Sequence, residues 1–182
     1  MLSPPLRDKA NWPVLWAALE EDAVQAVSTD HCPWNYATQK VLGRDAFNAI
    51  PNGAPGIETR VPLLFSEGVG KGRLSLERFV EVCSTSPARI FGLYPQKGII
   101  AVGSDADLVI YDPHQQVTLS QDRLHQQVDY CPYEGWKVVG YPVVVLLRGQ
   151  VIVEHGQFTG HAGQGQFVKR QVSCAYEQSS SS

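Results

Sequence analysis

The sequence lacks features that mark several common classes of protein. No apolar run approaches the roughly 18 residues that identify a membrane-spanning helix, and Met1–Pro5 lack the charged and apolar regions of a signal peptide. With 15 basic and 18 acidic residues, the chain has a net charge of -3 and no basic excess of the kind that nucleic-acid binding proteins show. We therefore expect no membrane and no nucleic-acid partner.

Motifs that mark common catalytic sites are also absent. There is no P-loop, GxGxxG, GxSxG, HxH or HExxH. The five histidines are scattered, and a catalytic zinc ion needs about three protein ligands, so a metal site made wholly from this chain is not expected. The four cysteines lie far apart with no CxxC, which is typical of a reducing compartment and predicts a cytoplasmic location.

What is present is the composition of a folded protein, because 43% of the 182 residues are apolar and 18% are charged. The first 95 residues mix helical and extended patterns. Apolar residues at helical spacing predict helices over 12–19 and 57–67 and from Ser75 onward. A short apolar run predicts a buried strand over 23–29.

After residue 95 the sequence becomes rich in β-branched residues, with turns between the segments. The predicted strands are 98–102, 107–111, 143–147 and 151–153, of which the last two form a hairpin. The sequence thus predicts an α/β part over residues 1–95, a mostly β part over 96–168, and a polar, disordered tail over 169–182.

Few polar residues stand out as candidates for chemistry. Asp30 and His31 follow the predicted strand, where α/β folds often carry active-site groups. A helix cap or a loop salt bridge is the simpler explanation for both residues. Asn52 precedes a glycine, which is ordinary turn chemistry, and Ser3 lies at the terminus. Asp30 remains available as one ligand of a metal site whose other ligands lie elsewhere.

Six longer motifs, in a fixed order and spacing, resemble the dihydropyrimidinases and D-hydantoinases, which are cyclic amidohydrolases of the amidohydrolase superfamily. The motifs are Ser3–Arg7 (SPPLR), Thr29–Pro33 (TDHCP), Ile50–Gly53 (IPNG), Pro55–Glu58 (PGIE), Phe91–Gly98 (FGLYPQKG) and Ala101–Ile110 (AVGSDADLVI). The resemblance covers about residues 2–170. The chain resembles the C-terminal portion of a protein more than twice its length.

The resemblance implies a fold and an activity. Residues 1–95 would form the last part of a (β/α)8 TIM-like barrel, and 96–168 the C-terminal strands of a flanking β-sandwich. The full-length family hydrolyses the ring amide of dihydropyrimidines or 5-substituted hydantoins to N-carbamoyl amino acids, as in pyrimidine catabolism. It uses two zinc ions per subunit and forms homotetramers. Because the other zinc ligands of the family are absent here, we expect the chain alone to be inactive and to self-associate.

The resemblance also assigns roles to three residues. Asp30 would ligate one zinc ion and carry the proton from the attacking hydroxide to the leaving nitrogen. Ser3 and Asn52 would hold the ring amide and carbonyls of the substrate, largely through backbone groups. The alternatives are a non-catalytic dihydropyrimidinase-like scaffold or signalling protein, an independent β-rich binding module, and a truncated gene product. The presence of Asp30 and Asn52 favours descent from a hydrolase.

Overall fold

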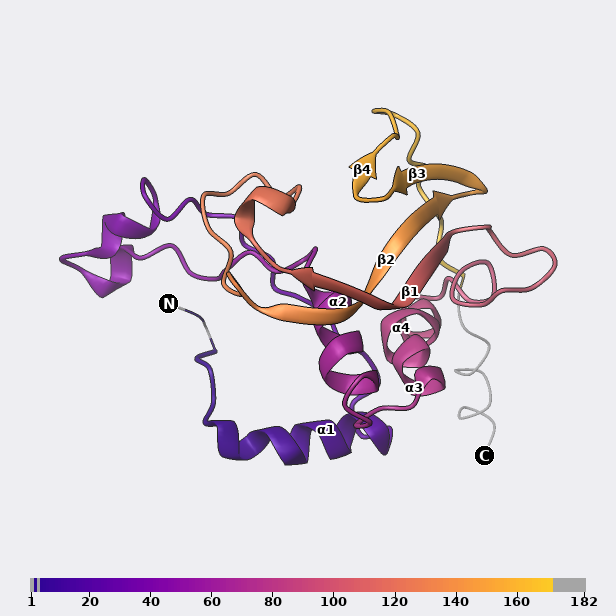
Figure 1. Cartoon of the computed structure of the whole chain (residues 1–182), viewed down its shortest axis with the longest axis horizontal. Coiled ribbons are helices and arrows are strands. Elements are labelled where there is room, and N and C mark those ends of the chain that lie inside the picture. The colour runs from indigo at the N-terminus through magenta and orange to yellow at the C-terminus, as the bar shows by residue number, and fades with distance from the viewer. Residues whose placement is uncertain (1, 3, 172–182) are drawn as a thin grey trace.

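The structure is a computed structural model that describes residue 2 and residues 4–171. Its helices lie on one face of a small antiparallel sheet, and a long arm projects to one side (Figure 1). The structure does not describe Ser3 or the residues from 172 onward. The predicted substrate contact of Ser3 and most of the predicted tail therefore lie outside the described residues.

The first part of the chain is helical and irregular. The helical elements, in order, are η1 Lys9–Asn11, α1 Trp12–Glu20, η2 Lys40–Gly43, η3 Phe47–Ala49, α2 Arg60–Leu64, η4 Phe65–Val69, α3 Leu76–Val80, η5 Glu81–Thr85 and α4 Ser86–Ile90. The last three follow one another without a break, so they form a single helical segment with a π-helical turn in its middle. We call residues 34–49, which contain η2 and η3, the arm (Figure 1).

The second part forms a four-stranded antiparallel sheet in the order β1-β2-β3-β4. Its elements are β1 Leu108–Thr118, η6 Gln121–Arg123, β2 Lys137–Leu147, β3 Gln150–Glu154 and β4 Gln157–Phe158. The predicted hairpin is confirmed. Arg148 and Gly149 connect β2 to β3 with φ angles of 47° and 79°, as a two-residue type I′ turn requires.

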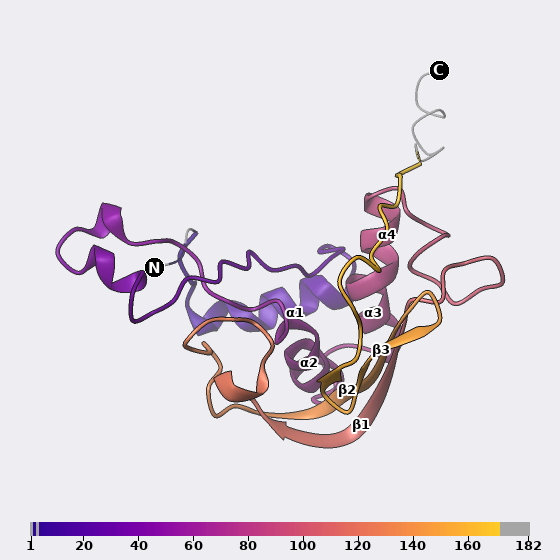
Figure 2. The same ribbon diagram turned by 90° about the horizontal axis from the view of Figure 1, so that it is seen from above.

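Helices and sheet share a hydrophobic core. Phe65 packs against Phe79 with ring centroids 5.3 Å apart and against Tyr111 of β1 at 4.6 Å. Gly140 of β2 makes this approach possible, because a Cβ atom there would lie 2.2 Å from the Phe65 ring. Figure 2 shows the curved sheet wrapping around this side of α2. This contact packs the helical part of the chain, before residue 95, against the sheet that follows it.

The three predicted helices are confirmed, with a small shift in the second. Residues 12–19 lie within α1, and the helix expected over 57–67 begins only at Arg60, after a turn. Ser75 caps α3, since its Oγ accepts a hydrogen bond from the Arg78 amide at 3.0 Å.

Two predicted strands are wrong. Residues 23–29 form no strand, and their backbone is held instead by single bonds such as Val27 N to Val82 O at 3.2 Å. Residues 98–102 are also irregular, with Ile100 86% exposed. In both cases no strand in the described part of the chain lies alongside to pair with the apolar segment. A β-rich composition becomes a strand only where a partner supplies the backbone hydrogen bonds.

Candidate active site

The structure brings the segments that carry Asp30 and Asn52 side by side. His31 and Ala54 form a parallel β-bridge, and the Cys32 amide donates to the Ala54 carbonyl at 3.1 Å. The Asp30 and Asn52 side chains themselves are exposed. Two candidates that are 22 positions apart in the sequence therefore lie on adjoining stretches of backbone with their side chains accessible.

His31 fastens these two segments together. Its Nδ1 accepts hydrogen bonds from the amides of Gly56 at 3.0 Å and Ile57 at 3.3 Å. A ring nitrogen that accepts does so through its lone pair, so Nδ1 holds both amides at one point. His31 therefore acts here as a structural acceptor, a role that its position next to Asp30 did not indicate.

The loop that carries Asn52 is held by donors from the arm. Trp34 Nε1 donates to the Asn52 carbonyl at 3.0 Å. The Lys40 ammonium donates to the carbonyls of Pro51 and Gly53, both at 2.5 Å. No sequence pattern indicated Trp34 or Lys40, because nothing in their local pattern marks a contact with a loop more than ten residues away.

A second set of contacts joins the arm to the β part of the chain. The Asp129 carboxylate accepts hydrogen bonds from the amides of Ala37 at 2.8 Å and Tyr36 at 2.5 Å. These backbone donors stabilise the charged form and hold the pKa of Asp129 below its usual range. The segment between β1 and β2 therefore braces the arm through a carboxylate that is ionised at neutral pH.

The same segment also reaches the end of the Asn52 loop. Glu58 accepts a hydrogen bond from the His125 amide at 2.6 Å, and its other oxygen lies 2.7 Å from His125 Nδ1. The loop with Asn52 is thus attached at one end to residues 30–40 and at the other to the β part.

Among the described residues, the Asp30 carboxylate has one weak side-chain contact. Its nearest side-chain partner is the Cys32 thiol, with Sγ 3.9 Å from Oδ1, and a thiol is a weak donor. Oxygen atoms of carboxylates are zinc ligands, so Asp30 fits the role of one ligand. Within residue 2 and residues 4–171, no group of three or more His, Cys, Asp or Glu side chains could hold a metal ion.

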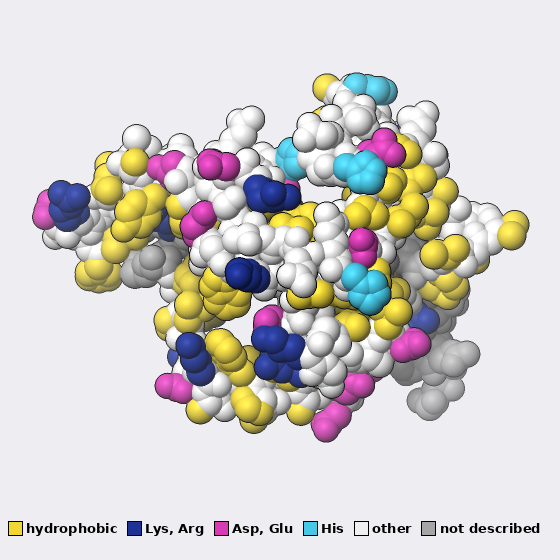
Figure 3. Space-filling view, viewed as in Figure 1, with side chains coloured by type: hydrophobic (Ala, Val, Ile, Leu, Met, Phe, Trp, Pro, Cys, Tyr) yellow, Lys and Arg dark blue, Asp and Glu magenta, His cyan; other side chains and the backbone are white. Residues whose placement is uncertain are grey.

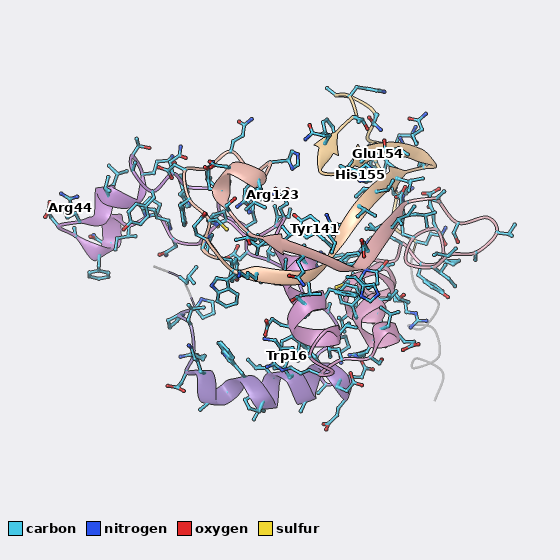
Figure 4. All side chains as sticks on the ribbon, in the orientation of Figure 1. Trp16, Arg44, Arg123, Tyr141, Glu154 and His155 are labelled. Carbon is cyan, nitrogen blue, oxygen red and sulfur yellow. The ribbon has the colours of Figure 1, made fainter. Side chains whose placement is uncertain are left out.

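Two hollows on the surface lie elsewhere. One, of about 610 Å³, lies against α1 and includes Trp16, and the other, of about 540 Å³, lies between η6 and the β2–β3 hairpin. Figure 4 labels Arg123, Tyr141 and His155 of the second hollow. Neither hollow is lined by Asp30 or Asn52. Asp30 and Asn52 are exposed on the surface outside these two hollows.

Exposed apolar side chains are numerous. On the face shown in Figure 3 they gather over the arm and at the opposite end of the molecule. Leu42 and Phe47 of the arm are 65% and 77% exposed. In the part of the chain that the structure describes, no helix has the length and apolar character needed to cross a membrane.

Comparison with known proteins gives one consistent result. The model of the Amidohydrolase family matches residues 6–152. D-hydantoinase from Geobacillus stearothermophilus is 53% identical over 168 residues, which are 92% of this chain and 36% of the relative. D-hydantoinase from Ralstonia pickettii is 49% identical over 170 residues, with 93% and 37% covered.

Solved structures agree with the sequence comparison. D-hydantoinase from Bacillus sp. AR9 and dihydropyrimidinase from Brevibacillus agri each superpose with a TM-score of 0.91 at 54% identity. Each covers 93% of this chain, which spans 37% of either structure. The chain thus spans little more than a third of the relatives it matches. Since the family model covers both the helical part and most of the sheet, the chain belongs to the amidohydrolase family.

Proposed function

We propose that this chain supplies part of the active site of a hydrolase that opens the ring amide of dihydropyrimidines or 5-substituted hydantoins, giving N-carbamoyl amino acids. The observation that carries the proposal is the joining of the Asp30 segment to the Asn52 loop by the His31–Ala54 bridge, with both candidate side chains exposed. The D-hydantoinases among the relatives support the substrate class.

In this proposal Asp30 has two tasks. Its carboxylate oxygen would help to hold one of two zinc ions per subunit, and the carboxylate would carry the proton from the attacking hydroxide to the leaving ring nitrogen. Zinc, when bound, lowers the pKa of a bound water to about 7, so that hydroxide forms at neutral pH. The remaining ligands would come from the part of the relatives that this chain does not match.

Asn52 and Ser3 bind the substrate in this proposal, largely through backbone groups next to the ring amide and carbonyls. The fixed loop around Asn52 supports this role, because a small planar ring needs donors and acceptors that are already in place before it binds. Ser3 lies outside the described residues, so its role rests on the resemblance alone.

The architecture that we propose places residues 1–95 in the last part of a (β/α)8 barrel and 96–168 in the C-terminal strands of a β-sandwich, with 169–182 as a tail. A cytoplasmic homotetramer is the corresponding assembly. An independent β-rich binding module is disfavoured, since the family match extends from residue 6 through the helices into the sheet.

A chimera tests the proposed function. Residues matched by the Geobacillus stearothermophilus D-hydantoinase, 168 in number, would replace the corresponding segment of that enzyme. We expect the chimera to hydrolyse a 5-substituted hydantoin or dihydrouracil to the N-carbamoyl product. A folded chimera that binds zinc as the parent enzyme does, yet hydrolyses neither ring, would contradict the proposal.

A further inference from the structure

The Lys40 side chain reaches out of the arm to the backbone on either side of Asn52. Its ammonium lies 2.5 Å from the Pro51 carbonyl and 2.5 Å from the Gly53 carbonyl. Trp34 Nε1 donates to the Asn52 carbonyl, which lies between these two, at 3.0 Å. Three consecutive carbonyls of one loop are therefore bound by two side chains of a single neighbouring segment.

The chemistry of these contacts suits a lysine. An ammonium has three donors and is compact enough to serve two carbonyls at once. Hydrogen bonds from a charged donor are stronger than those from a neutral one. In the part of the chain that the structure describes, no carboxylate forms an ion pair with Lys40. The carbonyls are therefore the partners of this charge, and the side chain is partly buried against them.

The loop needs such an anchor. Gly53 adopts a φ angle of 95°, a region that glycine reaches freely, and glycine loses the most conformational freedom when its backbone is fixed. Without the bonds to the flanking carbonyls, the Asn52 backbone would sample several conformations. With them, the groups of Asn52 are held in one arrangement before a substrate arrives.

We propose that Lys40 is a positioning residue that fixes Asn52 for the substrate ring without touching the substrate itself. This inference rests on the proposed function of Asn52. The contribution of Lys40 would then appear mainly in substrate binding, through the order of the loop, and the two contacts to carbonyls would be its means of action.

Hydrogen exchange tests the contact without any need for activity. In the chimera, we expect Lys40→Met to speed hydrogen exchange of the Cys32 amide and the Trp34 indole N–H, which donate to the Ala54 and Asn52 carbonyls of the loop, because methionine keeps the length of the side chain but has no donor. Lys40→Arg, which keeps the charge, should restore protection at least in part. Lys71→Met is the matched control, since Lys71 pairs with Glu67 on an exposed helical turn.

Kinetics of the chimera test the consequence for the substrate. We expect Lys40→Met to raise KM about tenfold, the effect of losing roughly 1.4 kcal/mol of positioning, with a smaller fall in kcat and an unchanged Tm. Lys40→Arg should lie between Lys40→Met and wild type. Unchanged exchange of the Cys32 amide and the Trp34 indole N–H, or an unchanged KM, would overturn the inference. A folded, zinc-binding wild-type chimera with no activity would instead overturn the proposed function.

Discussion

Gly53 lies against Cys32 so closely that the Asn52 loop has no room for a side chain at this position. A Cβ atom built on Gly53 would lie 2.5 Å from Cys32 Cβ and 2.6 Å from its Sγ. The next atom it would approach is the Asp30 carbonyl oxygen at 3.8 Å. The missing side chain thus lets the backbone next to Asn52 pack onto the segment that carries Asp30.

Substituting Gly53 tests this packing. We expect Gly53→Ala to lower the free energy of unfolding by about 1–3 kcal/mol through overpacking, and to displace the loop from Cys32. The measurement is denaturant unfolding of the chimera, together with KM for the ring substrate. KM should rise, because the displaced loop carries Asn52.

Gly103→Ala provides the matched control. Gly103 has a φ angle of 93°, almost the same as that of Gly53, but nothing lies within 4 Å of its Cβ position. Both substitutions bear the cost of a positive φ, so the difference between them isolates the contact with Cys32. Equal losses of stability for the two variants would show that the close approach of Gly53 to Cys32 adds nothing to the cost of the substitution.

Replacing the Asn52 side chain should affect catalysis rather than stability. Asn52→Ala should raise KM and lower kcat in the chimera, because in this proposal the exposed side chain adds to the backbone contacts with the ring. Tm should change little, since the loop is held through its backbone carbonyls. Steady-state kinetics and thermal unfolding are the measurements. A large loss of stability with unchanged kinetics would show instead that Asn52 serves only as a turn residue.

The contacts of Asp129 indicate that the stability of the arm depends on pH. Its folded-state pKa is lowered by the Ala37 and Tyr36 amides, so its contribution to stability is fully present above the unfolded pKa of about 4. The contribution is lost as the pH falls through the lower folded-state pKa. Asp129→Asn should therefore lower Tm at pH 7 and have a smaller effect at pH 2.5.

The control for this pH effect is Asp45→Asn, which removes an exposed carboxylate of the same arm. Thermal unfolding at the two pH values gives the comparison. We expect Asp45→Asn to change Tm little at either pH. A Tm difference between wild type and Asp129→Asn that stays constant from pH 7 to pH 2.5 would show that the amide contacts do not depend on the charge of Asp129.

Sequence patterns predicted the elements that depend on local spacing. Trp12, Leu15, Trp16 and Leu19 marked α1, and the turn at Arg148 and Gly149 marked the hairpin. Patterns failed where the outcome depends on a distant partner. The apolar run over 23–29 became no strand, since no neighbouring strand in the described structure pairs with it.

The candidate site shows the same division. Asp30 and Asn52 came from motifs, and the structure places their segments together. The residues that hold the segments in place could not be predicted, because His31 bonds to Gly56 and Lys40 to Pro51 across irregular loops. Such contacts have no period and no composition that a single sequence displays.

The chain as it stands should self-associate. β1 lies at an edge of the sheet with 11 residues, and unpaired edges seek strands of other molecules. Ile100 and Val102 are 86% and 108% exposed. We expect light scattering coupled to gel filtration to show oligomers or aggregates without stoichiometric zinc, and no ring hydrolysis. A 20.0 kDa monomer with two bound zinc ions would contradict this prediction.

Asp30 carries the central claim, and its substitution in the chimera tests that claim most directly. The measurement is the turnover of dihydrouracil and of a 5-substituted hydantoin by wild type, Asp30→Ala and the control Asp45→Asn, with zinc content determined for each. General acid–base action alone is worth about 10²–10⁴-fold, and loss of a zinc ligand adds to it. We therefore predict that Asp30→Ala abolishes hydrolysis and lowers bound zinc, while Asp45→Asn keeps both. An Asp30→Ala chimera that retains a tenth of the wild-type turnover would contradict the account, because the expected loss is at least about 10²-fold.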